Sequence, residues 1–148
     1  VPEQLSLLEI LEVRTVLELY IVKKAAENIT EQQIEELQAS IDKMQKLMEE
    51  GDNGSVEESA FHRGLAEAAG NSALKSIYFL CEELFNSVQH YTWKGVQSVE
   101  GAPNTAVPDH QAILDALKEH NTNRAEILMR SHMEYAKMNI ERLYANQE

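Results

Sequence analysis

The spacing of apolar residues constrains the fold of this chain more than any other feature. From about Leu5 to Asn28, apolar side chains recur every three or four residues, which places Leu7, Leu11 and Ile21 on one face of a helix. Later segments repeat this spacing, and none alternates between apolar and polar residues over the length of a strand. Glycine and proline, which interrupt helices, number only six and three. The sequence therefore predicts an all-α fold.

Turn residues and helix caps divide the chain into about six helices. Thr30 and Gln33 have the spacing of a capping box, and Gly70 follows the run AEAA as a residue that ends helices. We expect one domain over residues 1–148, with helices at about Leu5–Asn28, Thr30–Gly51, Ser55–Gly70, Ser72–Val99, Pro108–His120 and from Arg124 to the last residue. Helices of these lengths joined by short loops pack as an antiparallel bundle.

The charge of the chain limits its binding partners. Acidic residues outnumber basic residues 25 to 13, which gives a formal net charge of −12. Such a surface repels phosphate groups, so we expect this segment itself to contact neither DNA nor an anionic membrane. There is no apolar run long enough to span a bilayer, and the segment VPEQLSLLEILE is too acidic for a signal peptide. The single cysteine, Cys81, lies in the apolar run IYFLCEELF, where a buried, unreactive thiol fits a cytoplasmic protein.

Three of the five histidines occupy the apolar faces of their helices. His62 lies one turn after Glu58, and His110 and His132 have apolar neighbours at helical spacing, so we expect all four side chains to point inward. A buried imidazole without a partner is energetically unfavourable, and a shared divalent cation would remove that penalty. Imidazole nitrogens bind zinc, nickel or cobalt. The sequence therefore predicts a metal site, most simply for zinc, formed by Glu58, His62, His110 and His132, with a coordination position open to a small anion.

Each of these residues also has a simpler interpretation. A single inward histidine is usually a core residue with an ordinary hydrogen bond. Ser55 and Glu58 have the spacing of a capping box, so the Glu58 side chain could instead cap its own helix. Helical spacing alone leaves both alternatives open.

Arg14 is a second polar residue on an apolar face, between Leu11 and Leu17 of the first helix. A guanidinium group in that position needs a partner. Glu18, one turn later, is the simplest partner. The alternative is that Arg14 binds the carboxylate of a ligand through paired hydrogen bonds.

The remaining polar and aromatic candidates are assigned outside the site. His90 lines either a cavity or a subunit interface, and His120 at a helix C-terminus suits the helix dipole. Gly64 indicates either close helix packing or room beside a cavity, and Tyr78 and Phe79 have the spacing of core aromatic residues.

Four motifs in this order resemble a known family. They are ILEVRTVLE at residues 10–18, FHRGLAEAAGN at 61–71, DHQAILDAL at 109–117 and AEILMRSHM at 125–133. Together they are similar to the C-terminal effector-binding domain, the FCD domain, of the FadR subfamily of GntR-type transcription regulators. The similarity covers nearly the whole chain from about Leu5.

The resemblance implies a helical bundle around a central cavity that holds a metal and a small carboxylate effector. By position, the metal ligands would be Glu58, His62, His110 and His132, and Arg14 would meet the effector. The family more often has aspartate where this chain has Glu58. Such regulators dimerise and bind operator DNA through an N-terminal winged helix-turn-helix, which is not visible before Val1. The metal histidines argue against the fatty-acyl-CoA-binding branch of the family.

Three functions are therefore compared. The first is a ligand-sensing regulatory domain that is not an enzyme. The second is a metal-dependent hydrolase-like enzyme, which an open coordination position would allow, although the chain has no HExxH motif and no paired ExxH motifs. The third is a helical interaction scaffold without a small-molecule site. The sequence favours the first.

Overall fold

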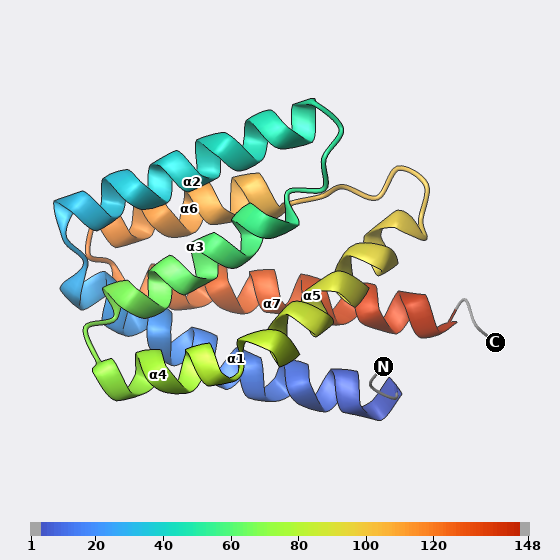
Figure 1. Cartoon of the computed structure of the whole chain (residues 1–148), viewed down its shortest axis with the longest axis horizontal. Helices are drawn as coiled ribbons and strands as arrows, with labels where there is room; N and C mark the ends of the chain where they lie inside the picture. The colour runs from blue at the N-terminus through green and yellow to red at the C-terminus, as the bar shows by residue number, and fades with distance from the viewer. Residues whose placement is uncertain (1–3, 146–148) are drawn as a thin grey trace.

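The computed structural model describes residues 4–145, which form seven α-helices and no β-strand (Figure 1). The helices are α1 (Gln4–Asn28), α2 (Glu31–Glu49), α3 (Ser55–Ala68), α4 (Ser72–Leu80), α5 (Glu82–Gln97), α6 (Ala106–Lys118) and α7 (Thr122–Ala145). The prediction of an all-α fold is confirmed. Among these helices, none is both long enough and apolar enough to cross a membrane.

The helices pack in two layers with α3 between them (Figure 1). The long helices α1 and α7 run antiparallel along one side, and α2 and α6 lie together on the other. Helix α5 crosses α7 at an angle. The core between the layers contains fully buried side chains from several helices, among them Ile21, Phe61, Leu114 and Met129. Helices α3, α6 and α7 thus bring their inner faces to a common centre.

Two of the expected helix ends are confirmed. Thr30 caps α2: its hydroxyl accepts a hydrogen bond from the Gln33 amide at 3.2 Å, and the Gln33 side chain accepts one from the Thr30 amide at 3.0 Å. Gly70 follows α3 with φ of +74°, a left-handed conformation that glycine adopts without a steric penalty.

The start of α3 differs from the prediction. Ser55 does not cap this helix but is its first residue, and the cap position belongs to Gly54, with φ of +70° and no side-chain hydrogen bond. The side chains of Asp52 and Asn53 hold the turn by accepting from the amides of Gly54 and Ser55 at 2.7 and 3.0 Å. Glu58 is therefore not part of a capping box, and its carboxylate is available for other contacts.

The prediction of one helix from Ser72 to Val99 is wrong, and the bundle has seven helices rather than six. The chain bends at Cys81, whose amide is shared between the carbonyls of Ile77 and Tyr78. The bend has a tertiary cause, because α4 packs against α3 whereas α5 crosses to α1 and α7. Cys81 is half-buried at this bend rather than fully buried as predicted.

Two glycines allow helices to approach closely. A Cβ atom at Gly64 of α3 would lie 2.7 Å from Cδ2 of Leu37 on α2, which confirms close packing at this position. A Cβ atom at Gly95 of α5 would lie 1.9 Å from the backbone carbonyl oxygen of Asn139 on α7. Backbone therefore packs on backbone where α5 crosses α7.

Candidate metal centre and adjoining cavity

The predicted metal ligands converge at the centre of the bundle. Glu58 and His62 come from α3, His110 from α6 and His132 from α7, and one ligand atom from each lies within 4.8 Å of the others. The Glu58 carboxylate lies among three imidazole Nε2 atoms: Oε1 is 3.0 Å from His62 and 3.4 Å from His132, and Oε2 is 3.1 Å from His110. His62 and His110 are almost fully buried. Residues separated by as many as 74 positions therefore form one cluster.

Two further carboxylates orient the imidazoles. Glu18 Oε2 on α1 lies 2.9 Å from His62 Nδ1, and Asp109 Oδ2 on α6 lies 2.8 Å from His132 Nδ1. An ionised carboxylate only accepts hydrogen bonds, so each Nδ1 carries a hydrogen, and in the neutral imidazole each Nε2 is then the nitrogen that can bind a cation. This carboxylate–histidine arrangement is typical of metal ligands. His110 is oriented differently, by stacking on the Phe61 ring at 4.0 Å between centroids.

The chemistry of the donor atoms fits a divalent cation. Both His110 ring nitrogens and Glu58 Oε2 are buried and have no hydrogen-bond partner among the described residues, although Nε2 and Oε2 lie only 3.1 Å apart. Electron-rich atoms brought together without a donor repel each other unless a proton or a cation lies between them. Three neutral imidazoles and one carboxylate are a ligand set that zinc accepts.

Burial and neighbouring charges act in opposite directions on the pKa values of the cluster. Burial raises the pKa of Glu58, but His110 and the other two imidazoles outweigh burial and hold that pKa well below its usual range. Burial lowers the pKa of His132, but Asp109 and Glu58 outweigh it and raise that pKa to about 9. For His110, burial dominates and the pKa is lowered. Burial lowers the pKa of His62 too, but Glu18 and Glu58 outweigh it and raise that pKa.

Glu18 and Asp109 were not predicted as parts of the site. Glu18 was expected only as a partner of Arg14, and Asp109 had no assigned role. Asp109 directly precedes His110 but contacts His132, because adjacent helical residues point in different directions. Spacing within one helix could not reveal contacts between helices.

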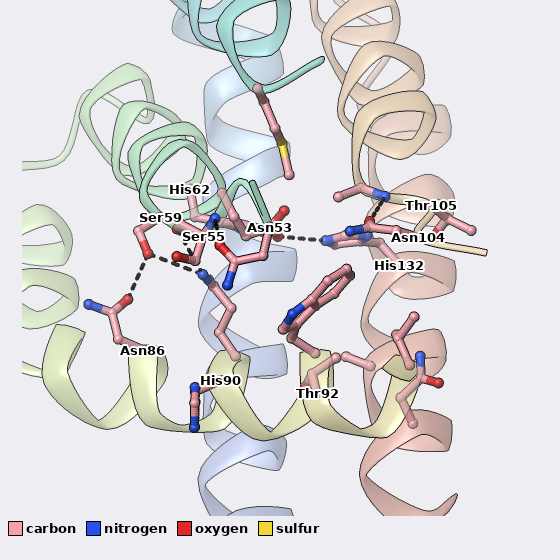
Figure 2. Close-up of a pocket in the computed structure, with 18 of the residues that line it drawn as sticks. Asn53, Ser55, Ser59, His62, Asn86, His90, Thr92, Asn104, Thr105 and His132 are labelled. Carbon is pink, nitrogen blue, oxygen red and sulfur yellow. Dashed lines mark hydrogen bonds and ion pairs between the residues drawn. The ribbon is translucent and has the colours of Figure 1, made fainter. Parts of the chain in front are cut away.

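A cavity of about 490 Å³ adjoins the cluster (Figure 2). His62 and His132 form part of its wall, and α5 contributes His90 and Thr92 on the facing side. Neutral polar side chains line much of the rest, including Ser59, Asn86, Asn104 and Thr105, together with the apolar side chains of Trp93, Val96 and Met133. His90, predicted to line a cavity or an interface, lines the cavity. His120 lies outside it, and its Nδ1 donates to the Ala26 carbonyl at 2.8 Å.

Arg14 has the partner that the simpler interpretation predicts, Glu18, and it also lies at the cavity. It lines the cavity, and its Nε lies 3.5 Å from Glu18 Oε1. Nη1 donates to the Phe85 carbonyl at 3.5 Å, and the guanidinium carbon lies 5.7 Å from the centre of the Phe85 ring. Only 5% of Arg14 is exposed. The side chain is therefore held in place by weak contacts, beside a carboxylate that also holds a metal-ligand histidine.

We expect opposite pH dependences for the chelator-treated and zinc-loaded protein. The pKa of His132, raised to about 9, makes its protonated form stabilise the folded, metal-free state fully below pH 6.5. This stability is lost as pH rises toward 9, with a slope of up to about 1.4 kcal/mol per pH unit. Zinc binds the neutral imidazole, so zinc affinity increases over the same window. Thermal unfolding between pH 6.5 and 9 measures both trends.

The variant His132→Gln is the control for this pH dependence. It should reduce the slope in chelator, because one of the two imidazoles with a raised pKa is gone and only His62 remains. A metal-free protein whose stability rises between pH 6.5 and 9 would contradict the assignment.

Comparisons with known proteins place this arrangement in a family. Residues 9–135 match the family model for the FCD domain. Two curated relatives are the HTH-type transcriptional regulator LutR of Bacillus subtilis, 29% identical over 126 residues, and the Uxu operon regulator of Haemophilus influenzae, 28% identical over 136 residues. The matches cover 84% and 89% of this chain but only 58% and 50% of the relatives, so the chain spans a little over half of their length.

Two solved structures share the fold. The match to a Streptococcus agalactiae GntR protein has a TM-score of 0.73 and a sequence identity of 20%, and it covers 90% of this chain and 59% of that protein's chain. The match to E. coli McbR/YncC has a TM-score of 0.73 and a sequence identity of 23%, and it covers 95% of this chain and 65% of that protein's chain. The family match and the two regulators confirm the prediction that the chain is not an enzyme. Because the family model matches most of its length, this chain belongs to the FCD domain family.

Proposed function

We propose that this chain is the ligand-sensing domain of a bacterial transcription regulator of the FadR subfamily, and that it binds zinc and a small carboxylate. The observation that carries the proposal is the convergence of His62, His110 and His132 on Glu58 at the wall of a cavity that also contains Arg14. Glu58, His62, His110 and His132 would hold the metal. A bound divalent cation would neutralise the buried carboxylate and offer a position to an anionic ligand.

The charges around the cavity support a small carboxylate as effector. Apart from histidines, the described residues that line the cavity include two cationic side chains, Arg14 and Arg63. Arg63 already pairs with Glu82 at the surface. Arg14 is the more buried and is only weakly engaged, so its guanidinium is the group best able to bind a carboxylate beside the metal.

In the intact regulator, we propose that an N-terminal winged helix-turn-helix binds operator DNA and that two copies of this domain form a dimer. The length of the relatives beyond the matched region supports a further domain. The apolar row Val13, Val16 and Tyr20 on the outer face of α1 is exposed and supports a contact with a second copy. Effector binding would change operator affinity only to the extent that the ligand prefers one arrangement of the dimer.

The variant Arg14→Gln tests the proposed binding of a small carboxylate. Purified wild-type protein should contain one zinc per chain by elemental analysis and should bind lactate or gluconate by calorimetry. Arg14→Gln should keep its zinc but bind the acid at least about tenfold more weakly, because a charge-assisted hydrogen bond contributes about 1.5–3 kcal/mol.

Arg63→Gln is the matched control, since Arg63 also lines the cavity but is paired with Glu82. It should leave acid affinity nearly unchanged. Equal affinities in wild type and Arg14→Gln would refute the role of Arg14, and protein without bound zinc would refute the metal site.

A further inference from the structure

Glu18 is the residue that contacts both halves of the proposed site. Its side chain is fully buried on α1. Oε2 lies 2.9 Å from His62 Nδ1, on the metal side, and Oε1 lies 3.5 Å from Arg14 Nε, on the ligand side. We propose that Glu18 is a positioning residue that couples the two halves, so that one carboxylate sets both the affinity for the cation and the affinity for the acid. This inference rests on the proposed function.

The burial of Glu18 requires both contacts. An ionised carboxylate removed from water is strongly destabilising unless it is paired and hydrogen-bonded. Two potentially cationic side chains lie against Glu18: His62, with Nδ1 at 2.9 Å, and Arg14, with Nε at 3.5 Å. The charge of Glu18 is thus shared between His62 and Arg14.

The two contacts of Glu18 differ in strength. The contact with His62 is a well-formed hydrogen bond at 2.9 Å. By contrast, Glu18 Oε1 and Arg14 Nε have no hydrogen-bond partner among the described residues, and their separation of 3.5 Å makes the pair mainly electrostatic. Glu18 therefore fixes the His62 ring firmly but keeps the guanidinium near the cavity without occupying its donors. A ligand carboxylate could bind these donors without displacing a strong internal hydrogen bond.

Asp109 provides a natural comparison within the same site. It holds His132 Nδ1 at 2.8 Å, as Glu18 holds His62. Its other side-chain contact is with the Thr105 hydroxyl at 2.8 Å, and no contact with Arg14 is present in the described part of the chain. Loss of the Asp109 charge should therefore affect the metal half alone.

The experiment compares Glu18→Gln with Asp109→Asn. Zinc affinity is measured by competition with a chelator, and lactate and gluconate affinities are measured by calorimetry at saturating zinc. Both variants should bind zinc about 10- to 100-fold more weakly, the usual effect of removing a residue that orients a metal ligand. Only Glu18→Gln should also bind the acid at least tenfold more weakly, because a neutral amide no longer holds the Arg14 guanidinium in position at the cavity wall.

The outcomes separate this inference from the proposed function. Wild-type protein that binds neither zinc nor either acid would refute the proposed function. Wild-type protein that binds both, with Glu18→Gln affecting only one affinity, would refute the coupling alone. If Glu18→Gln does not fold, Glu18→Asp is used instead. Its shorter side chain keeps the negative charge but moves it away from His62 and Arg14. This variant should bind both zinc and the acid more weakly. Unchanged acid affinity in Glu18→Asp with weakened zinc binding would also overturn the coupling.

Discussion

A Gly95→Ala variant is expected to lose at least about 3 kcal/mol of folding stability, at the upper end of the effects of overpacking. The added Cβ atom would lie 1.9 Å from the carbonyl oxygen of Asn139 and 2.5 Å from its carbonyl carbon. These are backbone atoms, so α5 and α7 must move apart. In a chain of this size the melting temperature should fall by roughly 6–12 °C, measured by thermal unfolding. Alanine favours an isolated helix over glycine by about 1 kcal/mol, so a loss can only come from packing.

Gly64→Ala is the control for this prediction. The atom in its way is Cδ2 of Leu37, the end of a flexible side chain that can rotate. Gly64→Ala should therefore lower the folding stability much less than Gly95→Ala does, and equal effects would show that α5 and α7 are not in backbone contact at Gly95.

The contact between α5 and α7 also matters for the site, because α5 carries His90 and α7 carries His132 on facing walls of the cavity. In folded Gly95→Ala protein, the displaced helices should consequently bind the acid more weakly than the wild type does.

The inward direction of the candidate metal ligands could be predicted from sequence because it depends on local periodicity. Glu58 and His62 are one turn apart and share a face in any helix. His110 and His132 follow the apolar faces of α6 and α7, which must turn toward the core. The resemblance to the FCD domain added that these faces meet, which periodicity alone left open.

Contacts between helices could not be predicted in the same way. The bend at Cys81 carries no glycine or proline and follows from the different helices that α4 and α5 contact. The contact between Glu18 and His62 joins α1 to α3, and a charged residue next to Arg14 already had a sufficient local explanation. The close approach at Gly95 has no local signal either, since it depends on α7. Each of these features is set by tertiary structure.

Removal of the metal is expected to have the largest effect on stability. If zinc binds the folded state only, it stabilises that state by about 4 kcal/mol when free zinc is a thousandfold above its dissociation constant. For a chain of 148 residues, chelation should then lower the melting temperature by roughly 10 °C. Addition of zinc to the chelated protein should restore it. An unchanged melting temperature after chelation and reloading would contradict a metal at this centre.

Glu58→Gln tests whether the carboxylate at the centre of the cluster is responsible. Glutamine keeps the size of the side chain but removes the charge that the three Nε2 atoms surround at 3.0–3.4 Å. A neutral amide binds zinc poorly, so zinc should no longer shift the melting temperature of this variant. Glu57→Gln is the matched control: Glu57 is the preceding residue, is buried, and pairs with Lys43 at 3.1 Å instead of with the histidines. Zinc should stabilise Glu57→Gln as it does the wild type, and a zinc shift retained in Glu58→Gln would mean that the cation binds without this carboxylate.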